Sequence, residues 1–176
     1  MKDNAYYEDV NINGTLNIFV AARDNNVKKV VYASSSSVYG DNYSLPKKED
    51  FIGMPLSPCA LTKRVYELYS SLFSSIYNLQ TIGLRYFNVF GKNQDPDSQY
   101  SAVIPKFIKS FLNGVTPTIN GDGHYSRDFT YVENIIEANL KACISDESLS
   151  GEVFNIGCGD TITLNKLYSI LASSLN

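Results

Sequence analysis

The stretch that decides the fold is KVVYASSSSVYG, residues 29–40. Its first five residues form a short run rich in β-branched side chains and bounded by polar residues, which is typical of a buried strand. The serines that follow mark the exit from that strand into a loop. Upstream, residues 9–25 carry apolar side chains along one side and end in polar residues, which predicts a helix.

The alternation of strand and helix continues downstream. Ser57 and Pro58 can cap and open a long helix through Tyr77, because proline is tolerated in a first helical turn. Further elements are expected as strands over 81–87, 118–120 and 153–156, an extended segment over 129–132, and helices over 103–112, 133–145 and 163–175, the last capped by Thr163. Strands alternating with helices imply an α/β fold with a parallel sheet.

The composition bounds the class of protein. A chain of 176 residues, 44% hydrophobic and 19% charged, is one ordinary globular domain. A net charge of −3 argues against a nucleic-acid partner, and no apolar stretch approaches the length of a membrane span or a signal core. The three cysteines are widely spaced, which favours a reducing cytoplasm and offers no zinc-type pairing, so we expect no metal site.

A dinucleotide-binding loop is not found where a Rossmann domain would carry it. Such a domain opens with a strand, a glycine-rich turn and a helix, whose N–H groups hold the cofactor pyrophosphate. Nothing near residue 1 has this pattern. The Gly-x-Gly pairs at 121–123 and 157–159 are isolated, and we interpret both as turns.

Eight short motifs share their order and spacing with a known family. They are SSSVYGD (35–41), LPK (45–47), GMPLSP (53–58), ALTK (60–63), GLRYFNVFG (83–91), VIPK (103–106), INGDG (119–123) and SRDF (126–129). Together they resemble the extended short-chain dehydrogenase/reductase family of NAD-dependent sugar-nucleotide epimerases and dehydratases. Within it, the chain most resembles UDP-N-acetylhexosamine 4-epimerases of surface-polysaccharide pathways, acting on UDP-GlcNAc and UDP-GalNAc.

The resemblance implies a partial Rossmann-like parallel sheet, containing only the later strands, with part of a small C-terminal substrate-binding lobe. Residues 1–176 would form one partial domain. About residues 1–91 would hold the second half of the sheet and the active-site helix, and 92–176 the substrate-binding segments with a returning strand and helix. The chain would thus be truncated at both ends relative to the family. The family also pairs its long helices into a dimer, for which residues 9–25 and 57–77 are the candidates.

The chemistry that the resemblance implies is reversible oxidation at C4 of a UDP-sugar. A tyrosine phenolate, aided by a lysine, removes the 4-hydroxyl proton while hydride passes to NAD. The resemblance assigns Ser35 and Lys63 to catalysis; Ser34, Lys63 and Tyr86 to the cofactor; and Ser36, Ser37, Asn88, Val103, Lys106, Asn120 and Arg127 to the UDP-sugar, with Asn11 as an active-site asparagine. Arg127 suits the diphosphate because a guanidinium offers a bidentate fork.

Cys59 departs from the family pattern, because it occupies the position of the catalytic tyrosine. A thiol is much shorter than a phenol, so a 4-hydroxyl placed for tyrosine would lie beyond its direct reach. We interpret Cys59 as a small buried residue replacing the lost tyrosine, with a water-relayed thiolate base as the alternative. The chain as written is therefore expected to be inactive.

Two other functions stay open at this stage, and a third, dehydration, is disfavoured. A 4,6-dehydratase would need an Asp-Glu pair just after the serines, which is not present. A UDP-glucose or UDP-uronate 4-epimerase shares the serine cluster. A truncated, non-enzymatic paralogue is the other open function, and its first strand would form an uncovered apolar edge that promotes aggregation or pairing with another chain.

Overall fold

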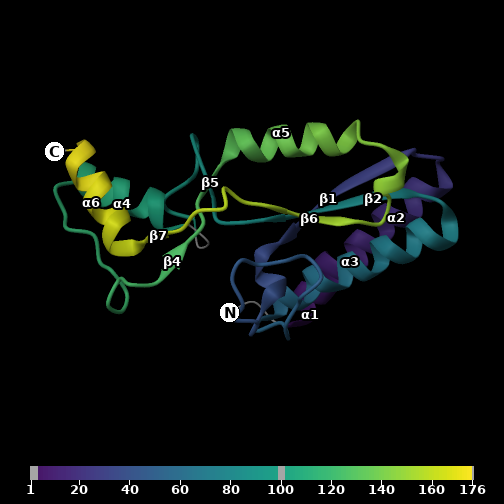
Figure 1. The fold of residues 1–176 in the computed structure, drawn as a ribbon, viewed down its shortest axis with the longest axis horizontal. Coiled ribbons are helices and arrows are strands. Elements are labelled where there is room, and N and C mark those ends of the chain that lie inside the picture. Colours follow the sequence, from purple (N-terminus) through teal and green to yellow (C-terminus); the bar gives the residue numbers. More distant parts are fainter. Residues whose placement is uncertain (1–3, 99–101, 176) are drawn as a thin grey trace. The chain divides into compact units, whose positions relative to one another are not determined.

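The computed structural model describes residues 4–98 and 102–175 (Figure 1). By their internal contacts the residues divide into two compact units. Unit 1 comprises residues 1–86 with 136–156, and unit 2 comprises residues 87–135 with 157–176. None of the described helices combines the length and apolar composition needed to cross a bilayer.

Unit 1 is built on a three-stranded parallel sheet. Its strands are β1 (Lys29–Ser35), β2 (Gln80–Tyr86) and β6 (Val153–Ile156), in the order β1-β2-β6. β1 and β2 pair along their whole lengths, so their carboxyl ends meet at the same edge of the sheet. The sheet confirms the expected α/β class with parallel strands.

One face of this sheet is covered by the N-terminal helices and by α3. The N-terminal run comprises α1 (Asn4–Tyr7), a π-helical turn η1 (Glu8–Asn13) and α2 (Gly14–Asp24). It packs on α3 (Pro58–Tyr77) through a core of Phe19, Ala22, Phe73 and Leu79. The side chain of Ser57 accepts a hydrogen bond from the N–H of the first turn of α3, as expected for its cap.

The opposite face is covered by α5 (Val132–Cys143), which lies along the sheet in Figure 1. Ala142 packs against Ile82 and Leu84 of β2. Val31 of β1 joins this cluster, whereas its neighbours pack on the α3 face, because successive strand residues point to opposite faces. A 3₁₀ turn, η3 (Glu147–Leu149), follows α5 and leads towards β6.

Unit 2 joins two helices, α4 (Val103–Leu112) and α6 (Leu164–Leu175), around a core of Ile104, Phe107 and Leu167. The hydroxyl of Thr163 accepts from the N–H of Lys166 (3.2 Å), which confirms it as the α6 cap. Two small sheets complete the unit: parallel β3 (Val89–Phe90) with β5 (Thr130–Tyr131), and antiparallel β4 (Ser126–Arg127) with β7 (Ile162–Thr163).

One expected strand does not form. Residues 118–120 lie in irregular structure, and no strand runs beside them in the described part of the chain. Ile119 instead packs against the core of unit 2. The prediction was wrong because an extended apolar segment becomes a strand only where a partner supplies the backbone hydrogen bonds.

Candidate active site

The serine segment leaves the carboxyl end of β1. Ser34 is buried and donates to the carboxylate of Glu67 (2.6 Å). Ser35 caps a 3₁₀ turn, η2 (Ser36–Tyr39), and its Oγ accepts from both the N–H (3.1 Å) and the hydroxyl (2.9 Å) of Ser37. These two bonds occupy the acceptor sites of the Ser35 hydroxyl, so its remaining capacity is to donate its own proton.

α3 presents Cys59, Lys63 and Glu67 at four-residue intervals, hence along one face of the helix. The ammonium of Lys63 donates to the carbonyl of Ala33 (2.8 Å), two residues before Ser35, and lies 4.7 Å from the ring centroid of Tyr66. Burial lowers the pKa of Lys63 below its ordinary value. Lys63 therefore lies beside the serine end of β1.

Cys59 lies in the first turn of α3 and is exposed, so the interpretation of it as a buried residue was wrong. Ala60 and Thr62 beside it are buried, so the exposure of Cys59 reflects the side of the helix on which it lies and not its place in the first turn. The carbonyl of Cys59 accepts from the hydroxyl of Thr62 (2.9 Å), which accepts from the amide of Asn11 (3.1 Å) in η1. The expected active-site asparagine is thus tied to the same turn of α3 as Cys59.

Tyr86 ends β2 and is the register partner of Ser35. Its hydroxyl donates to the side-chain oxygen of Asn139 (3.0 Å) in α5. The phenol is therefore engaged on the face of the sheet that α5 covers, whereas the side chain of Ser34 is bonded to α3 on the other face. Of the remaining serines, Ser36 is half-buried and Ser37 is exposed.

A buried ion pair beneath these residues was not predicted from the sequence. Glu67 and Arg85 are almost fully buried and form a bidentate pair, Nε to Oε1 at 2.8 Å and Nη2 to Oε2 at 3.0 Å. Arg64 adds a third bond at 2.9 Å. Burial alone would raise the pKa of Glu67, but the bonds from Arg85 and Ser34 outweigh it and hold the pKa below its ordinary value. The available signal was a charged residue inside the apolar strand 81–87, which needs a partner.

The same arginine ties the serine turn to the sheet. Arg85 Nη1 donates to the hydroxyl of Tyr39 (3.0 Å) and to the carbonyl of Glu49 (2.9 Å). The Tyr39 hydroxyl in turn donates to the side-chain oxygen of Asn155 (2.7 Å) in β6. Through the Tyr39 hydroxyl, the turn that follows Ser35 is bonded to both β2 and β6, which gives the serine segment a fixed conformation.

The expected UDP-sugar residues outside the serines all lie in unit 2, where they surround two cavities. One cavity of about 450 Å³ is lined by Asn88, Val103 and Arg127 among others. A second, of about 540 Å³, is lined by Val103, Lys106 and Asn120. The Asn88 amide donates to the carbonyl of residue 128 (3.0 Å), and the Arg127 guanidinium is exposed.

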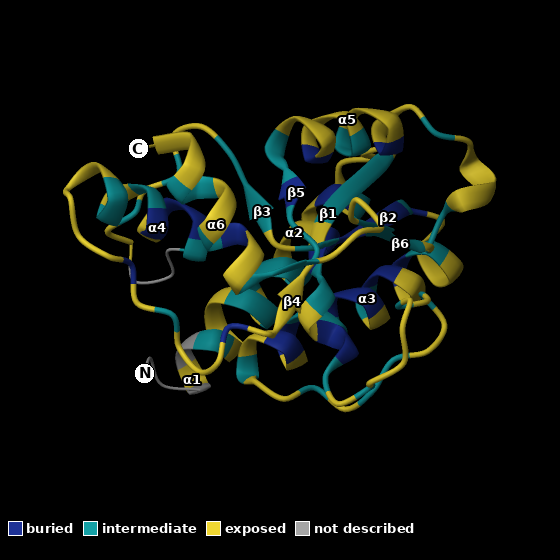
Figure 2. Cartoon of the chain, turned by 60° about the vertical axis from the view of Figure 1, so that its left-hand side comes forward, coloured by how far each residue is buried: buried dark blue, intermediate teal, exposed yellow. Residues whose placement is uncertain are grey.

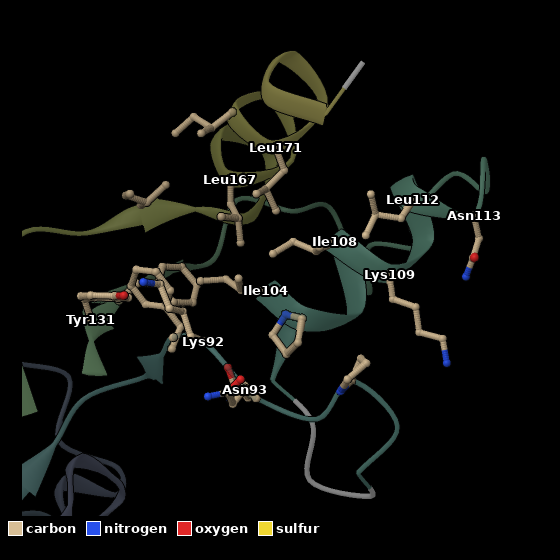
Figure 3. Close-up of a pocket in the computed structure, with 18 residues that line it drawn as sticks. Lys92, Asn93, Ile104, Ile108, Lys109, Leu112, Asn113, Tyr131, Leu167 and Leu171 are labelled. Atoms are coloured by element: carbon tan, nitrogen blue, oxygen red, sulfur yellow. The ribbon is translucent and has the colours of Figure 1, made fainter. Parts of the chain in front are cut away.

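A larger cavity of unit 2, about 860 Å³, contains none of the expected site residues (Figure 3). Ile108 and Leu112 of α4 and Leu167 and Leu171 of α6 contribute apolar side chains to it. Lys109 also lines it from α4. Its lining is predominantly apolar, unlike the polar set that a sugar diphosphate needs.

Neither Gly-x-Gly pair is a phosphate cradle. The N–H groups of Cys158 (3.0 Å) and Gly159 (2.9 Å) both donate to the carboxylate of Asp128, which already occupies the place of an anion. At the other pair, Gly121 and Gly123 have φ of +80° and +73°, as in a turn. His124, beside it, is an exposed loop residue, as expected. Among the described residues the glycine-rich segments therefore act as turns.

Residues 1–157 match the NAD dependent epimerase/dehydratase family. The chain belongs to this family. A putative UDP-glucose 4-epimerase of Methanocaldococcus jannaschii is 39% identical over 96% of this chain and 54% of its own length.

Solved structures of the family superpose closely on the chain. A UDP-N-acetylglucosamine 4-epimerase from Methanobrevibacter ruminantium, in complex with UDP-N-acetylmuramic acid, is 46% identical with a TM-score of 0.93, over 97% of this chain and 54% of that one. A UDP-glucuronic acid 4-epimerase from Bacillus cereus, with UDP-glucuronic acid and NAD, is 32% identical with a TM-score of 0.88, over 98% and 54%. The chain thus spans about half the length of these relatives.

Proposed function

We propose that this chain is a homologue of UDP-N-acetylhexosamine 4-epimerases that keeps the sugar-side residues of the site but does not catalyse epimerisation by itself. The observation that carries the proposal is the arrangement of Ser35 and Lys63, at the end of β1 and on the adjoining turn of α3. The 46% identity to a UDP-N-acetylglucosamine 4-epimerase supports UDP-GlcNAc and UDP-GalNAc as the substrate class.

The roles of the residues follow from their bonding. Ser35 has a free O–H to donate to the 4-hydroxyl oxygen of a hexose, because both its acceptor sites are bonded within η2. Lys63 has N–H groups beyond the one bonded to Ala33, and these can meet a ribose hydroxyl of the cofactor. NAD, when bound, supplies the hydride acceptor of the reaction. Cys59 ends too far from a hydroxyl placed for a tyrosine to remove its proton directly.

The described residues fit only one end of NAD. Lys63 suits the nicotinamide ribose, whereas the Gly157–Gly159 turn is closed to a pyrophosphate by the carboxylate of Asp128. We propose that unit 2 contributes Asn88, Val103, Lys106, Asn120 and Arg127 to the UDP-sugar. The chain alone is then expected to bind NAD weakly and to turn over no sugar nucleotide.

Two alternatives have specific support. A non-enzymatic paralogue is favoured by Cys59 at the base position. A UDP-glucose or UDP-uronate preference is favoured by the relatives, which include epimerases of both sugars.

The test measures NAD binding by calorimetry and interconversion of UDP-GlcNAc and UDP-GalNAc for three proteins. The first is this chain, and the second, the repaired fusion, is its Cys59→Tyr variant joined to the N-terminal part of the Methanobrevibacter ruminantium relative. The third is the same fusion with Cys59 retained, which serves as the matched control. We expect activity only in the repaired fusion.

Each outcome decides one part of the proposal. Robust epimerisation by the unmodified chain would overturn its inactivity. Equal turnover in both fusions would show that Cys59 serves as the base. A folded, repaired fusion that binds no UDP-N-acetylhexosamine but binds UDP-glucose or UDP-glucuronate would reject the substrate assignment.

A further inference from the structure

We infer that Arg85 and Arg64 keep the carboxylate of Glu67 fully occupied, so that Lys63 remains an uncompensated cation beside position 59. Arg85 is then a positioning residue of the site, acting through Glu67. The inference rests on the proposed function only for the roles of Lys63 and position 59.

The first observation is a pairing that would be expected but is not made. Lys63 and Glu67 lie four residues apart on one face of α3, a spacing at which opposite charges commonly pair. Their head groups bond to consecutive residues of β1, the carbonyl of Ala33 and the hydroxyl of Ser34. Yet, within residues 4–98 and 102–175, the carboxylate's ion-pair partners are Arg64 and Arg85 rather than Lys63.

The second observation explains why. Oε1 of Glu67 accepts from Ser34 (2.6 Å) and from Nε of Arg85 (2.8 Å). Oε2 accepts from Nη2 of Arg85 (3.0 Å) and from Nη1 of Arg64 (2.9 Å). A carboxylate has about four lone-pair sites, and these four bonds use them. No acceptor site on Glu67 is left for the ammonium of Lys63.

The third observation is the resulting charge. Two guanidiniums and one carboxylate give the cluster a net charge of about +1, and Lys63 adds another beside it. The surrounding titratable groups include the phenols of Tyr32 and Tyr39. Next to Tyr39 and Arg85 lie Lys47, over the Tyr39 ring, and Glu49, whose carbonyl accepts from Arg85; these two residues carry opposite charges. Buried charges are screened less than exposed ones. The positive field of Lys63 and of this cluster therefore acts one to two helical turns from position 59, and Glu67, the one carboxylate of α3, does not offset it.

Cys59 is a built-in reporter of this field, because it is exposed and its alkylation rate follows its thiolate fraction. The experiment measures second-order alkylation by iodoacetamide at pH 7 and low salt, resolved by peptide mass spectrometry. Cys158, exposed in unit 2, is the internal control in every sample. Folding of each variant is checked by circular dichroism.

The two partners of one ion pair should shift the rate in opposite directions. We expect Arg85→Gln to slow alkylation of Cys59 about twofold and Glu67→Gln to accelerate it about twofold, with Cys158 unchanged. A purely structural role would shift both variants in the same direction, because either one breaks the pair. Shifts of the same sign would overturn the inference.

A partly exposed partner keeps the test decisive if the buried variants do not fold. The side chain of Arg64 is 35% exposed, so Arg64→Gln removes a cluster charge at little structural cost. It should slow Cys59 about twofold. Lys141→Gln makes the same charge change on the exposed side of α5 and should leave the rate unchanged. Equal rates for Arg64→Gln, Lys141→Gln and the unmodified chain would also overturn the inference. No substrate is used, so a failed UDP-sugar assignment leaves this result untouched.

Discussion

Single residues decide how the site responds to acid. Burial alone would raise the pKa of Glu67, but the hydrogen bonds from Arg85 and Ser34 hold it below its ordinary value of 4.5. A carboxyl with a depressed folded-state pKa stabilises the protein above its unfolded pKa, and that contribution is lost as the pH falls through the folded pKa. The ion pair therefore favours the folded state near neutrality and loses its effect in the acid range.

The corresponding prediction concerns Glu67→Gln. At pH 7 the variant should lose about 3–5 kcal/mol of unfolding free energy, because Arg85 is left buried with an uncharged partner. Between pH 5 and pH 3 its further loss should be smaller than that of the unmodified chain. Urea unfolding across this range provides the measurement, with the exposed Glu133→Gln as a control. Parallel pH profiles for the Glu67 variant and the unmodified chain would contradict the assignment.

At the scale of elements, a glycine in β2 leaves room for the side chain of a tyrosine in the neighbouring strand β1. Gly83 and Tyr32 are register partners, and a Cβ at Gly83 would lie 2.5 Å from the Tyr32 hydroxyl. The space beside this glycine is therefore already filled by a buried phenol.

We expect Gly83→Ala to destabilise the chain by about 1–3 kcal/mol, because the added methyl overpacks the sheet. Gly14→Ala is the matched control, since a Cβ there meets nothing closer than 4.0 Å and the position is helical. It should be neutral or stabilising by up to about 1 kcal/mol. Equal melting temperatures for the two variants would show that the contact is easily relieved.

A further prediction concerns the edge strand β1 and the apolar side chains exposed on α5. β1 stands at one end of the strand order, and two apolar side chains of α5 are exposed, Ile136 (52%) and Leu140 (63%), with Ile144 (86%) just after the helix. Figure 2 shows the exposed side of α5. An unpaired strand edge can form backbone hydrogen bonds with another chain, and an exposed apolar helix face can pack against one. We expect the chain alone to aggregate, and to become soluble when co-expressed with the N-terminal part of a relative.

Soluble fractions after centrifugation give the readout. Leu140→Lys should raise the soluble fraction of the isolated chain, whereas Glu137→Gln, on the charged side of the helix, should not. A monodisperse, stable monomer of the unmodified chain would contradict the expectation.

At the scale of the whole molecule, α3 leaves an apolar stripe uncovered. The helical spacing of its apolar residues predicts a core stripe of Tyr66, Leu68, Tyr69, Leu72, Phe73 and Ile76. Tyr66 and Phe73 are buried, but Leu68, Leu72 and Ile76 are 51%, 48% and 64% exposed, so that prediction was wrong for half of the set. One face of a helix can meet its own sheet, and the apolar residues beyond that face need another partner.

We propose a second copy of the chain as that partner. In the soluble complex with the N-terminal part of a relative, Leu68→Glu should then shift the assembly from dimer to monomer in sedimentation velocity, because the charge would be buried between the two helices. Asn134→Glu, exposed in α5 on the other face of the sheet, is the control and should leave the dimer intact. An unchanged dimer in Leu68→Glu would place the interface elsewhere.

Local patterns determined much of this protein from its sequence alone. The β-branched run at 29–33, the Ser57 cap with Pro58 and the 3.6-residue periodicities predicted β1, α3, α4 and α6, because each depends on neighbours along the chain. The candidate site at Lys63 and the serines was predicted from the family resemblance instead, because local periodicity alone assigns no chemistry to these residues.

Only the tertiary structure decided how that site is held. The Glu67–Arg85 pair joins α3 to β2, and the Asp128 carboxylate closes the Gly157–Gly159 turn across some thirty positions. Neither contact has a local signature, because a buried charge can be satisfied by any partner the fold brings near. Burial is equally non-local, which is why Cys59 and the outer residues of α3 proved exposed although their residue types favoured the core.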